Sequence, residues 1–265
     1  MKKLLLVSAL ATAALVLSVG SASAATTCSF TSSGTTMTLD GNCTTDSTIS
    51  VPNGWTLDGA GFTITAVDPA FGHFLGAVVT NGGSSANVTN LGVTASGLAD
   101  VCDGGADRLR GILFDGASGS ITGNMVTNIN QGASGCQEGN GIEVRNLDFP
   151  GTFSVLISGN TVIGYQKNGI TANGGVSATI TGNIVGGAGR VTYIAQNGIQ
   201  VGFGGTGTVT GNSISGNYYN VPKSYVACGL LYADAAGVRA SQNMFRDDQF
   251  NVCNFGGRGG GHPSA

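Results

Sequence analysis

The sequence has little charge and few side chains that bind metals. Only 9% of its 265 residues are charged, and it contains two histidines and no Cys-x-x-Cys pair. A zinc site is therefore a poor explanation for its cysteines. The formal net charge of −3 becomes −5 once the two N-terminal lysines are left out. This acidity argues against nucleic acid as a partner.

The sequence also lacks helical periodicity after its first 24 residues. Its apolar residues fall in short runs rich in Val, Ile and Thr, separated by Gly and Asn, which is typical of β-strands joined by tight turns. Glycine is abundant (46 residues) but has no triplet period, so a collagen-like structure is excluded. These features predict an all-β protein.

Residues 1–24 have the pattern of a secretory signal peptide. Lys2 and Lys3 precede an apolar run (4–19), and Ala22-Ser23-Ala24 forms a small-residue cleavage site. The run is short and rich in Ala and Ser, and no stop-transfer segment follows, so a retained anchor is disfavoured. We expect a secreted protein with no membrane attachment after cleavage.

Two short phrases recur with a period of about 30 residues. The phrase Gly-Ile-x-x, with Leu for Ile in its last copy, begins at Gly111, Gly141, Gly169, Gly198 and Gly229. An Ile-Thr-Gly-Asn phrase, with conservative changes, occupies 121–124, 157–160, 180–183 and 209–212. Two phrases with one shared period predict a solenoid with one coil per repeat.

The repeats also assign directions to side chains. We expect inward columns at Ile112, Ile142, Ile170, Ile199 and Leu230, and at Phe114, Val144, Ala172, Val201 and Tyr232. Two more are expected at Ile121, Ile157, Ile180 and Val209, and at Val126, Val162, Val185 and Ile214. Between these, a ladder of stacked amides is expected at Asn124, Asn160, Asn183, Asn212 and Asn243, with a shorter one at Asn140, Asn168 and Asn197.

The predicted organisation is a signal peptide (1–24), an N-terminal cap (25–47), a parallel β-helix of about seven to eight coils (48–255) and a flexible Gly-rich tail (256–265). An even number of cysteines in a secreted chain indicates disulfides. Because residues one coil apart are stacked neighbours, the expected pairs are Cys102–Cys136 and Cys228–Cys253, and Cys28–Cys43 would then clip the N-terminal end.

These phrases, together with Thr56-Leu57-Asp58-Gly59-Ala60-Gly61-Phe62-Thr63-Ile64, resemble the right-handed parallel β-helix of the pectin-lyase-like superfamily. The closest likeness is to the repeats shared by carbohydrate-binding proteins and sugar hydrolases. The resemblance covers about residues 48–255 and implies a polysaccharide ligand on the sheet of the Gly-Ile strands, in a groove walled by the preceding loops.

By register, the outward positions of that sheet are Leu113, Glu143, Thr171, Gln200 and Leu231, followed two residues later by Asp115, Arg145 and Asn173. Candidate catalytic residues are Glu143, Lys167, Arg145 and Asp115. Candidate substrate-binding residues are Arg108, Glu138, Gln166, Tyr193, Gln200 and Tyr225, and Tyr165 and Arg190 lie in the same loops.

Two mechanisms fit these residues. Asp115 and Glu143 could act as the two carboxyl groups of a glycosidase. Arg145 or Lys167 could instead act as the base or the neutralising cation of a polyuronate lyase or epimerase. A structural alternative is that Asp115–Arg145 and Arg108–Glu138 are ordinary cross-strand ion pairs, whereas Glu143 has no charged neighbour in its own column.

A long loop carries three aspartates. Asp100, Asp103 and Asp107 could hold Ca²⁺, or they could simply be solvated. The Gly-His-Gly of polygalacturonases, the Asp-His pairing of pectate lyases and the Asp-Pro-His-Glu of alginate epimerases are all missing. No family's catalytic set can therefore be carried over, and catalysis stays open.

The function that the sequence favours is binding of an extracellular polysaccharide, with cleavage or epimerisation open. The basic side chains of the groove favour an acidic polymer. The first alternative is a non-catalytic surface or matrix module. The second is ice binding by outward files of Thr and Ser on the adjacent sheet, such as Thr179, Thr181, Thr208 and Thr210, although Leu156 and Arg239 interrupt these files.

Overall fold

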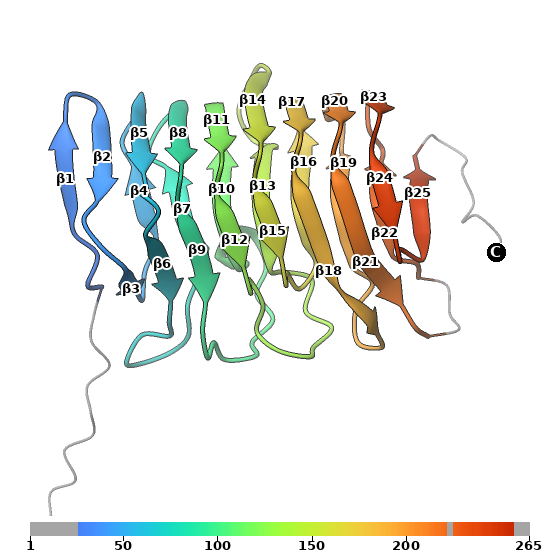
Figure 1. Ribbon diagram of the computed structural model, residues 1–265, viewed down its shortest axis with the longest axis horizontal. Helices are drawn as coiled ribbons and strands as arrows, with labels where there is room; N and C mark the ends of the chain where they lie inside the picture. Colours follow the sequence, from blue (N-terminus) through green and yellow to red (C-terminus); the bar gives the residue numbers. More distant parts are fainter. Residues whose placement is uncertain (1–25, 222–224, 257–265) are drawn as a thin grey trace, which may run out of the picture.

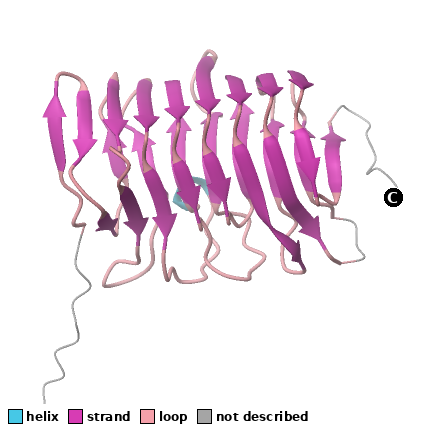
Figure 2. Cartoon of the chain, viewed as in Figure 1, coloured by secondary structure: helices cyan, strands magenta, loops and turns pink. Residues whose placement is uncertain are grey.

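Three β-sheets run the length of the molecule, and the chain visits each of them once per coil (Figure 1). The computed structural model describes residues 26–221 and 225–256. In this part of the chain the fold is a right-handed parallel β-helix of eight coils, and its only helical element is the short 3-10 turn η1 (Gly105–Asp107) (Figure 2). The predicted fold class is therefore confirmed.

The strands cycle through the sheets in order. Sheet A contains β1 (Phe30–Ser33), β2 (Thr36–Leu39), β5 (Trp55–Asp58), β8 (Ser85–Thr89), β11 (Ser118–Thr122), β14 (Phe153–Ser158), β17 (Val176–Thr181), β20 (Thr206–Thr210) and β23 (Gly237–Ser241). Sheet B contains β3 (Cys43–Thr45), β6 (Thr63–Ala66), β9 (Gly92–Ala95), β12 (Met125–Thr127), β15 (Thr161–Ile163), β18 (Ile184–Val191), β21 (Ser213–Tyr219) and β24 (Met244–Arg246). Sheet C contains β4 (Ile49–Val51), β7 (Ala77–Asn81), β10 (Arg110–Asp115), β13 (Asn140–Asn146), β16 (Asn168–Gly174), β19 (Asn197–Gly202), β22 (Cys228–Ala233) and β25 (Phe250–Phe255).

The register follows the sequence repeat. Ile112 lies opposite Ile142, which lies opposite Ile170, and all three are fully buried. The other predicted columns are aligned in the same way on sheets A and B. Branched apolar side chains stacked at one position of every coil thus fill the interior, as the period predicted.

The N-terminal strands show how the stack begins. β1 pairs with β2 antiparallel and forms one edge of sheet A. Parallel pairing already begins with β2 and β3, which lie within the segment 25–47 that we predicted as a cap. The predicted signal peptide and all of the predicted tail except Gly256 lie outside the described residues.

An asparagine ladder runs along the corner between sheets A and B. The Oδ1 atom of Asn183 accepts hydrogen bonds from the backbone N–H and the Nδ2 of Asn160, at 2.9 and 3.0 Å. The same pair of bonds links Asn124 to Asn160, Asn183 to Asn212 and Asn212 to Asn243. This prediction is confirmed. The shorter predicted ladder is only partly formed, because Asn197 donates to Asn168 while Asn140 donates to Glu143.

Covalent links hold three places in the stack. All three predicted disulfides are present: Cys28–Cys43, Cys102–Cys136 and Cys228–Cys253. Their number indicates an oxidising compartment of the extracellular type. No helix in the described ranges has the length and apolar character needed to cross a membrane.

The loops that connect sheet B to sheet C vary most in length and lie together along one edge of the molecule, the lower edge in Figure 1. These loops include η1 after β9 and the segments that follow β12, β15, β18 and β21. Each of these loops ends at the start of a sheet C strand.

The asparagine ladder makes a prediction for stability. Asn183→Ala removes the acceptor of two buried N–H groups of Asn160, so we expect the free energy of unfolding to fall by about 3 kcal/mol. Asn243→Ala is the matched control: Asn243 is the last ladder residue and is only partly buried, so its loss should cost less. Urea unfolding measures both, and equal losses at the two positions would contradict the ladder's role.

Candidate functional site

The outer face of sheet C is less exposed than the sequence predicted. The outward file of Leu113, Glu143, Thr171, Gln200 and Leu231 is at most 8% exposed. Leu231 packs with Cys228 and Cys253 in a small cluster separate from the main core, which confirms that this file points away from the interior. An open groove along this whole file is therefore not formed, and each candidate residue has to be judged from its own contacts.

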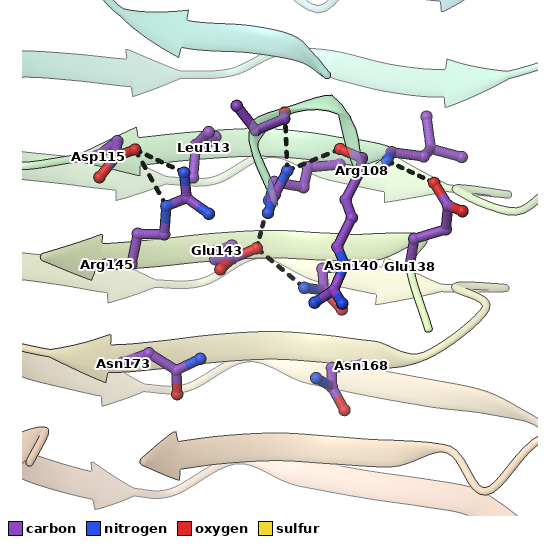
Figure 3. Close-up of polar contacts among 12 residues, drawn as sticks. Arg108, Leu113, Asp115, Glu138, Asn140, Glu143, Arg145, Asn168 and Asn173 are labelled. Carbon is purple, nitrogen blue, oxygen red and sulfur yellow. Dashed lines mark hydrogen bonds and ion pairs between the residues drawn. The ribbon is translucent and has the colours of Figure 1, made fainter. Parts of the chain in front are cut away.

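Glu143 has a charge partner that the sequence did not reveal. The Nε atom of Arg110 forms a buried ion pair with the Glu143 carboxylate, and Asn140 Nδ2 donates to the same oxygen at 2.9 Å (Figure 3). Arg110 also donates to the carbonyls of Gly105, Ala106 and Arg108. The reading of Glu143 as an unpaired carboxylate is wrong, because its partner lies diagonally across the strands and not in its own column.

Arg110 therefore has a clear structural task. Its guanidinium group joins the turn η1 to the face of β13, and it is only 2% exposed. Both charges of this pair are removed from water, so each is needed to balance the other. Oε2 of Glu143 is held in this arrangement, and the side chain is only 5% exposed.

Asp115 and Arg145 form the cross-strand ion pair that the register suggested. The Nη2 and Nε atoms of Arg145 lie 2.7 and 3.0 Å from one oxygen of Asp115 (Figure 3). Burial alone would lower the pKa of Arg145. The hydrogen bond and charge of Asp115, with the charges of Glu143 and Asp148, outweigh burial and raise that pKa above its ordinary value. Arg145 is therefore unsuited to act as a base.

The predicted pair of Arg108 and Glu138 is not formed. The fully buried Glu138 carboxylate accepts the backbone N–H of Leu109 at 2.9 Å (Figure 3) and that of Asp103 at 2.8 Å. Arg108 is exposed. These two peptide groups belong to the loop between β9 and β10 and occupy both carboxylate oxygens. Glu138 therefore does not pair with the Arg108 side chain.

Gln166 and Glu138 occupy equivalent positions in neighbouring coils, and both bind backbone groups of the loops through hydrogen bonds. Its Oε1 accepts the N–H of Gln131, and its Nε2 donates to Ser134 and to the carbonyl of Cys136. Further along the stack, Gln196 accepts the N–H of Ala188, and Gln249 accepts the N–H of Ala227. From the sequence, Glu138 and Gln166 are predicted to be substrate ligands. Glu138 and Gln166 each lie two residues before a strand-initial asparagine, Asn140 or Asn168, at the end of a loop. This shared position in the repeat is the sequence feature that indicates a role in holding the loops.

The three loop aspartates do not come together. Asp103 pairs with Nε2 of His73 at 2.9 Å, and Asp107 is exposed in η1. In the part of the chain that the structure describes, the only close group of metal-binding residue types is Cys102, Cys136 and Glu138. The two cysteines form a disulfide and Glu138 is occupied by peptide N–H groups. The predicted Ca²⁺ site is therefore not assembled, because the disulfide and Glu138 fix this loop in another shape.

A cavity of about 430 Å³ lies among the segments that precede β13, β16, β19 and β22. Its side chains are Gln137, Lys167, Tyr193, Tyr219 and Tyr225, and we call it the tyrosine pocket. Ile194 and Ala195 complete its lining. The structure thus brings together three of the predicted site residues, Lys167, Tyr193 and Tyr225, from loops far apart in the sequence. Gln137 and Tyr219 were missed, and nothing in the repeat pattern distinguishes them.

Lys167 is the charged group of this pocket. Its Nζ donates to the carbonyl of Ala195 at 2.8 Å, and no carboxylate of the described residues lies within ion-pair distance of it. Burial lowers the pKa of Lys167 to about 8. The side chain therefore carries a positive charge at neutral pH, in a place where no carboxylate of the described ranges balances it.

Two other predicted aromatic or basic residues lie elsewhere. Tyr165 is buried, and its hydroxyl donates to Oδ1 of Asn217 inside the coil, where burial raises its pKa well above the ordinary value. Arg190 stacks on the ring of Tyr218, with 3.9 Å from the guanidinium carbon to the ring centre. Neither lines the tyrosine pocket.

The files of small polar side chains on sheet A are in register, as predicted. Thr122 lies opposite Thr89 and Ser158, and Thr181 lies opposite Thr210. Some neighbours bond to one another, such as Thr210 with Ser241 at 3.0 Å. Leu156 and Arg239 are exposed within the files and interrupt them. This face offers hydroxyl groups in register.

No family model, no curated protein and no solved structure matches the chain.

The pair of Arg110 and Glu143 makes a prediction that separates a structural from a catalytic role. Arg110→Met leaves the Glu143 charge buried without a partner, and we expect it to lower the free energy of unfolding by about 3–5 kcal/mol. The double variant Arg110→Met with Glu143→Leu should recover most of that loss, because no buried charge remains. Denaturant unfolding of the two single variants and the double variant gives the coupling energy. Additive losses would show that the two charges do not depend on each other.

Proposed function

We propose that this chain is an extracellular β-helix that binds an acidic polysaccharide, with one uronic acid unit held in the tyrosine pocket. The observation that supports this most is Lys167, a partly buried cation without a carboxylate partner in a cavity lined by three tyrosines. A ligand carboxylate would supply the charge that the protein does not.

The chemistry of the lining suits a sugar. Tyrosine offers an apolar ring face with a polar tip, and pockets of this kind combine apolar surfaces with a few polar groups that fix orientation. The ring faces of Tyr193, Tyr219 and Tyr225 can cover the C–H surface of a pyranose, while Gln137 offers an amide to its hydroxyl groups. The pocket is partly closed to water, so an ammonium–carboxylate contact there is stronger than one in bulk solvent.

Binding is better supported than either cleavage mechanism. Hydrolysis needs two carboxyl groups at the scissile bond, and the described side chains that line the pocket include none. Elimination needs both a base and a neutralising cation. Among the described residues, Lys167 is the one cation of the pocket lining, and the paired Arg145 has a raised pKa.

Elimination remains the second candidate, because of one observation. The lowered pKa of Lys167, about 8, leaves part of this side chain as the neutral amine at pH 7, and a neutral amine can accept a proton. Elimination at this site would require a neutralising cation from outside the pocket lining.

Other features agree with an extracellular ligand. The three disulfides fit an oxidising compartment, and the repeat phrases resemble those of the pectin-lyase-like superfamily, in which carbohydrate ligands are common. A solenoid fold hosts many functions, so this likeness supports the proposal only together with the pocket.

The proposal predicts the effect of removing the pocket cation. Lys167→Met should weaken binding of an oligouronate by about 10- to 100-fold, the range expected for one hydrogen bond to a charged group. Wild-type affinity should fall about tenfold between pH 7 and pH 9, because only the charged amine binds a carboxylate and its pKa is about 8. Titration calorimetry measures both effects.

The control is Arg239→Gln, which removes an exposed cation from sheet A and should leave binding unchanged. In Lys167→Met the dependence on pH should disappear. Equal binding by the wild type and Lys167→Met would refute the proposal. Ultraviolet absorbance detects the unsaturated product of elimination. If the wild type releases such a product and Lys167→Met does not, elimination, and not binding alone, is the function of the pocket.

A further inference from the structure

The C-terminal end of the stack has no further coil over it within the described residues. β23, β24 and β25 are the last strands of sheets A, B and C, and each pairs with a described strand on one side only. Together they form one end of the molecule, opposite β1 and β2 (Figure 1). The peptide groups on their outer edges are therefore in a position to pair with another chain.

The apolar columns of the interior are also uncovered at this end. Val252 is 49% exposed, although its column partner Leu230 is fully buried. The last members of the inward columns are Val238, Ala240, Phe245 and Val252, and we call these four residues the open end. Each is exposed or half-buried, because no described coil packs over it. Side chains of the kind that fill the core elsewhere thus reach water here.

The asparagine ladder stops at the same end. The backbone N–H of each earlier member donates to the Oδ1 of the asparagine one coil further on. Asn243 is the last member, and no described residue accepts its backbone N–H. The corner between sheets A and B therefore ends on a donor to which a neighbouring chain could pair.

The N-terminal end, by contrast, is covered by the chain itself. β1 pairs with the edge of β2, and the N–H of Thr27 donates to the carbonyl of Thr44 in β3 at 2.9 Å. The disulfide Cys28–Cys43 holds this segment in place. The inward side chain of Val51 in the first coil is fully buried. The two ends of the stack thus differ: the first coil is covered, and the last coil is not.

We propose that the open end binds the open end of a second copy of this chain, which gives a dimer joined tail to tail about a two-fold axis. A second copy presents the same three strand edges and the same uncovered apolar columns, so each surface supplies what the other lacks. Pairing of the open end with an N-terminal end would instead build filaments, and the covered first coil disfavours it.

The strand lengths indicate where the axis lies. β25 is the longest of the three edges, with 6 residues against 5 in β23 and 3 in β24. We therefore place the axis beside β25, so that this strand runs antiparallel to its counterpart in the second copy. The same axis brings β23 of each copy beside β24 of the other.

Residues 257–265 are the alternative cover for the open end. They are rich in glycine and include no Val, Ile, Leu or Phe. They therefore lack the branched and aromatic side chains with which a neighbouring coil fills the interior. The last coil itself offers roughly 20 residues, close to the number that each partner contributes to an interface of standard size.

The test measures the mass of the chain without residues 1–24 by sedimentation. We expect a dimer at about 10 µM, because interfaces of standard size have dissociation constants from the micromolar range downwards. Val252→Lys should raise the dissociation constant at least about 100-fold, since the two-fold axis buries the new charge twice without a counter-charge. Ile184→Lys is the matched control: Ile184 is 55% exposed on sheet B away from the open end, and its replacement should leave the dimer unchanged. The thermal midpoint shows whether each variant is folded.

Hydrogen exchange of the unmodified chain provides a second measurement that needs no variant. Amide groups on the outer edges of β23, β24 and β25 should exchange more slowly as the protein concentration rises. Those of β1, at the covered end, should not change.

Four results would overturn the proposal. The first is a wild type that stays monomeric up to about 100 µM. The second is a monomer that becomes a dimer when residues 257–265 are deleted, because those residues would then be the cover in the full chain. The third is a series of filaments that lengthen with concentration, which requires pairing of unlike ends. The fourth is a dimer that withstands Val252→Lys and leaves exchange at β25 unchanged, which would place the interface elsewhere.

Discussion

Each coil of this protein is held by the coils on either side through hydrogen bonds at equivalent positions. Peptide groups make these bonds along three sheets, and the asparagine ladder makes them again at one corner. An asparagine side chain that meets two N–H groups of the neighbouring coil leaves no buried donor unpaired at the turn. Register is thereby fixed along the stack, and register decides which residues meet on the outer surface.

This dependence explains why much of the fold could be predicted from the sequence. A repeat of about 30 residues places Ile112, Ile142 and Ile170 in one column, and the structure shows them in register and buried. The ladder and two of the three disulfides, Cys102–Cys136 and Cys228–Cys253, follow from the same rule, since residues one coil apart are neighbours. The repeat period determines which side chains point inward, and that period can be read directly from the sequence.

The candidate site was less predictable, for physical reasons. The pairing of Arg110 with Glu143 is diagonal, so reading the columns alone missed it. Glu138 and Gln166 bind backbone N–H groups of irregular loops, and the conformations of those loops are not repeated in the sequence. Lys167, Tyr193 and Tyr225 were named because they are unusual residues near the right sheet. Their grouping with Tyr219 and Gln137 depends on loop shapes that only the structure shows.

The charged residues of the outer face now fall into two groups. Asp115, Arg145, Arg110 and Glu143 neutralise one another and stabilise the face, while Lys167 keeps a charge that the described protein groups do not balance. The central claim is that a ligand carboxylate provides that balance. A crystal structure with a bound uronate-containing oligosaccharide tests it most directly. Our account predicts a carboxylate oxygen about 2.8 Å from Nζ of Lys167, with the sugar ring against the tyrosines. A sugar bound on another face, with the pocket still empty at saturating ligand, would contradict it.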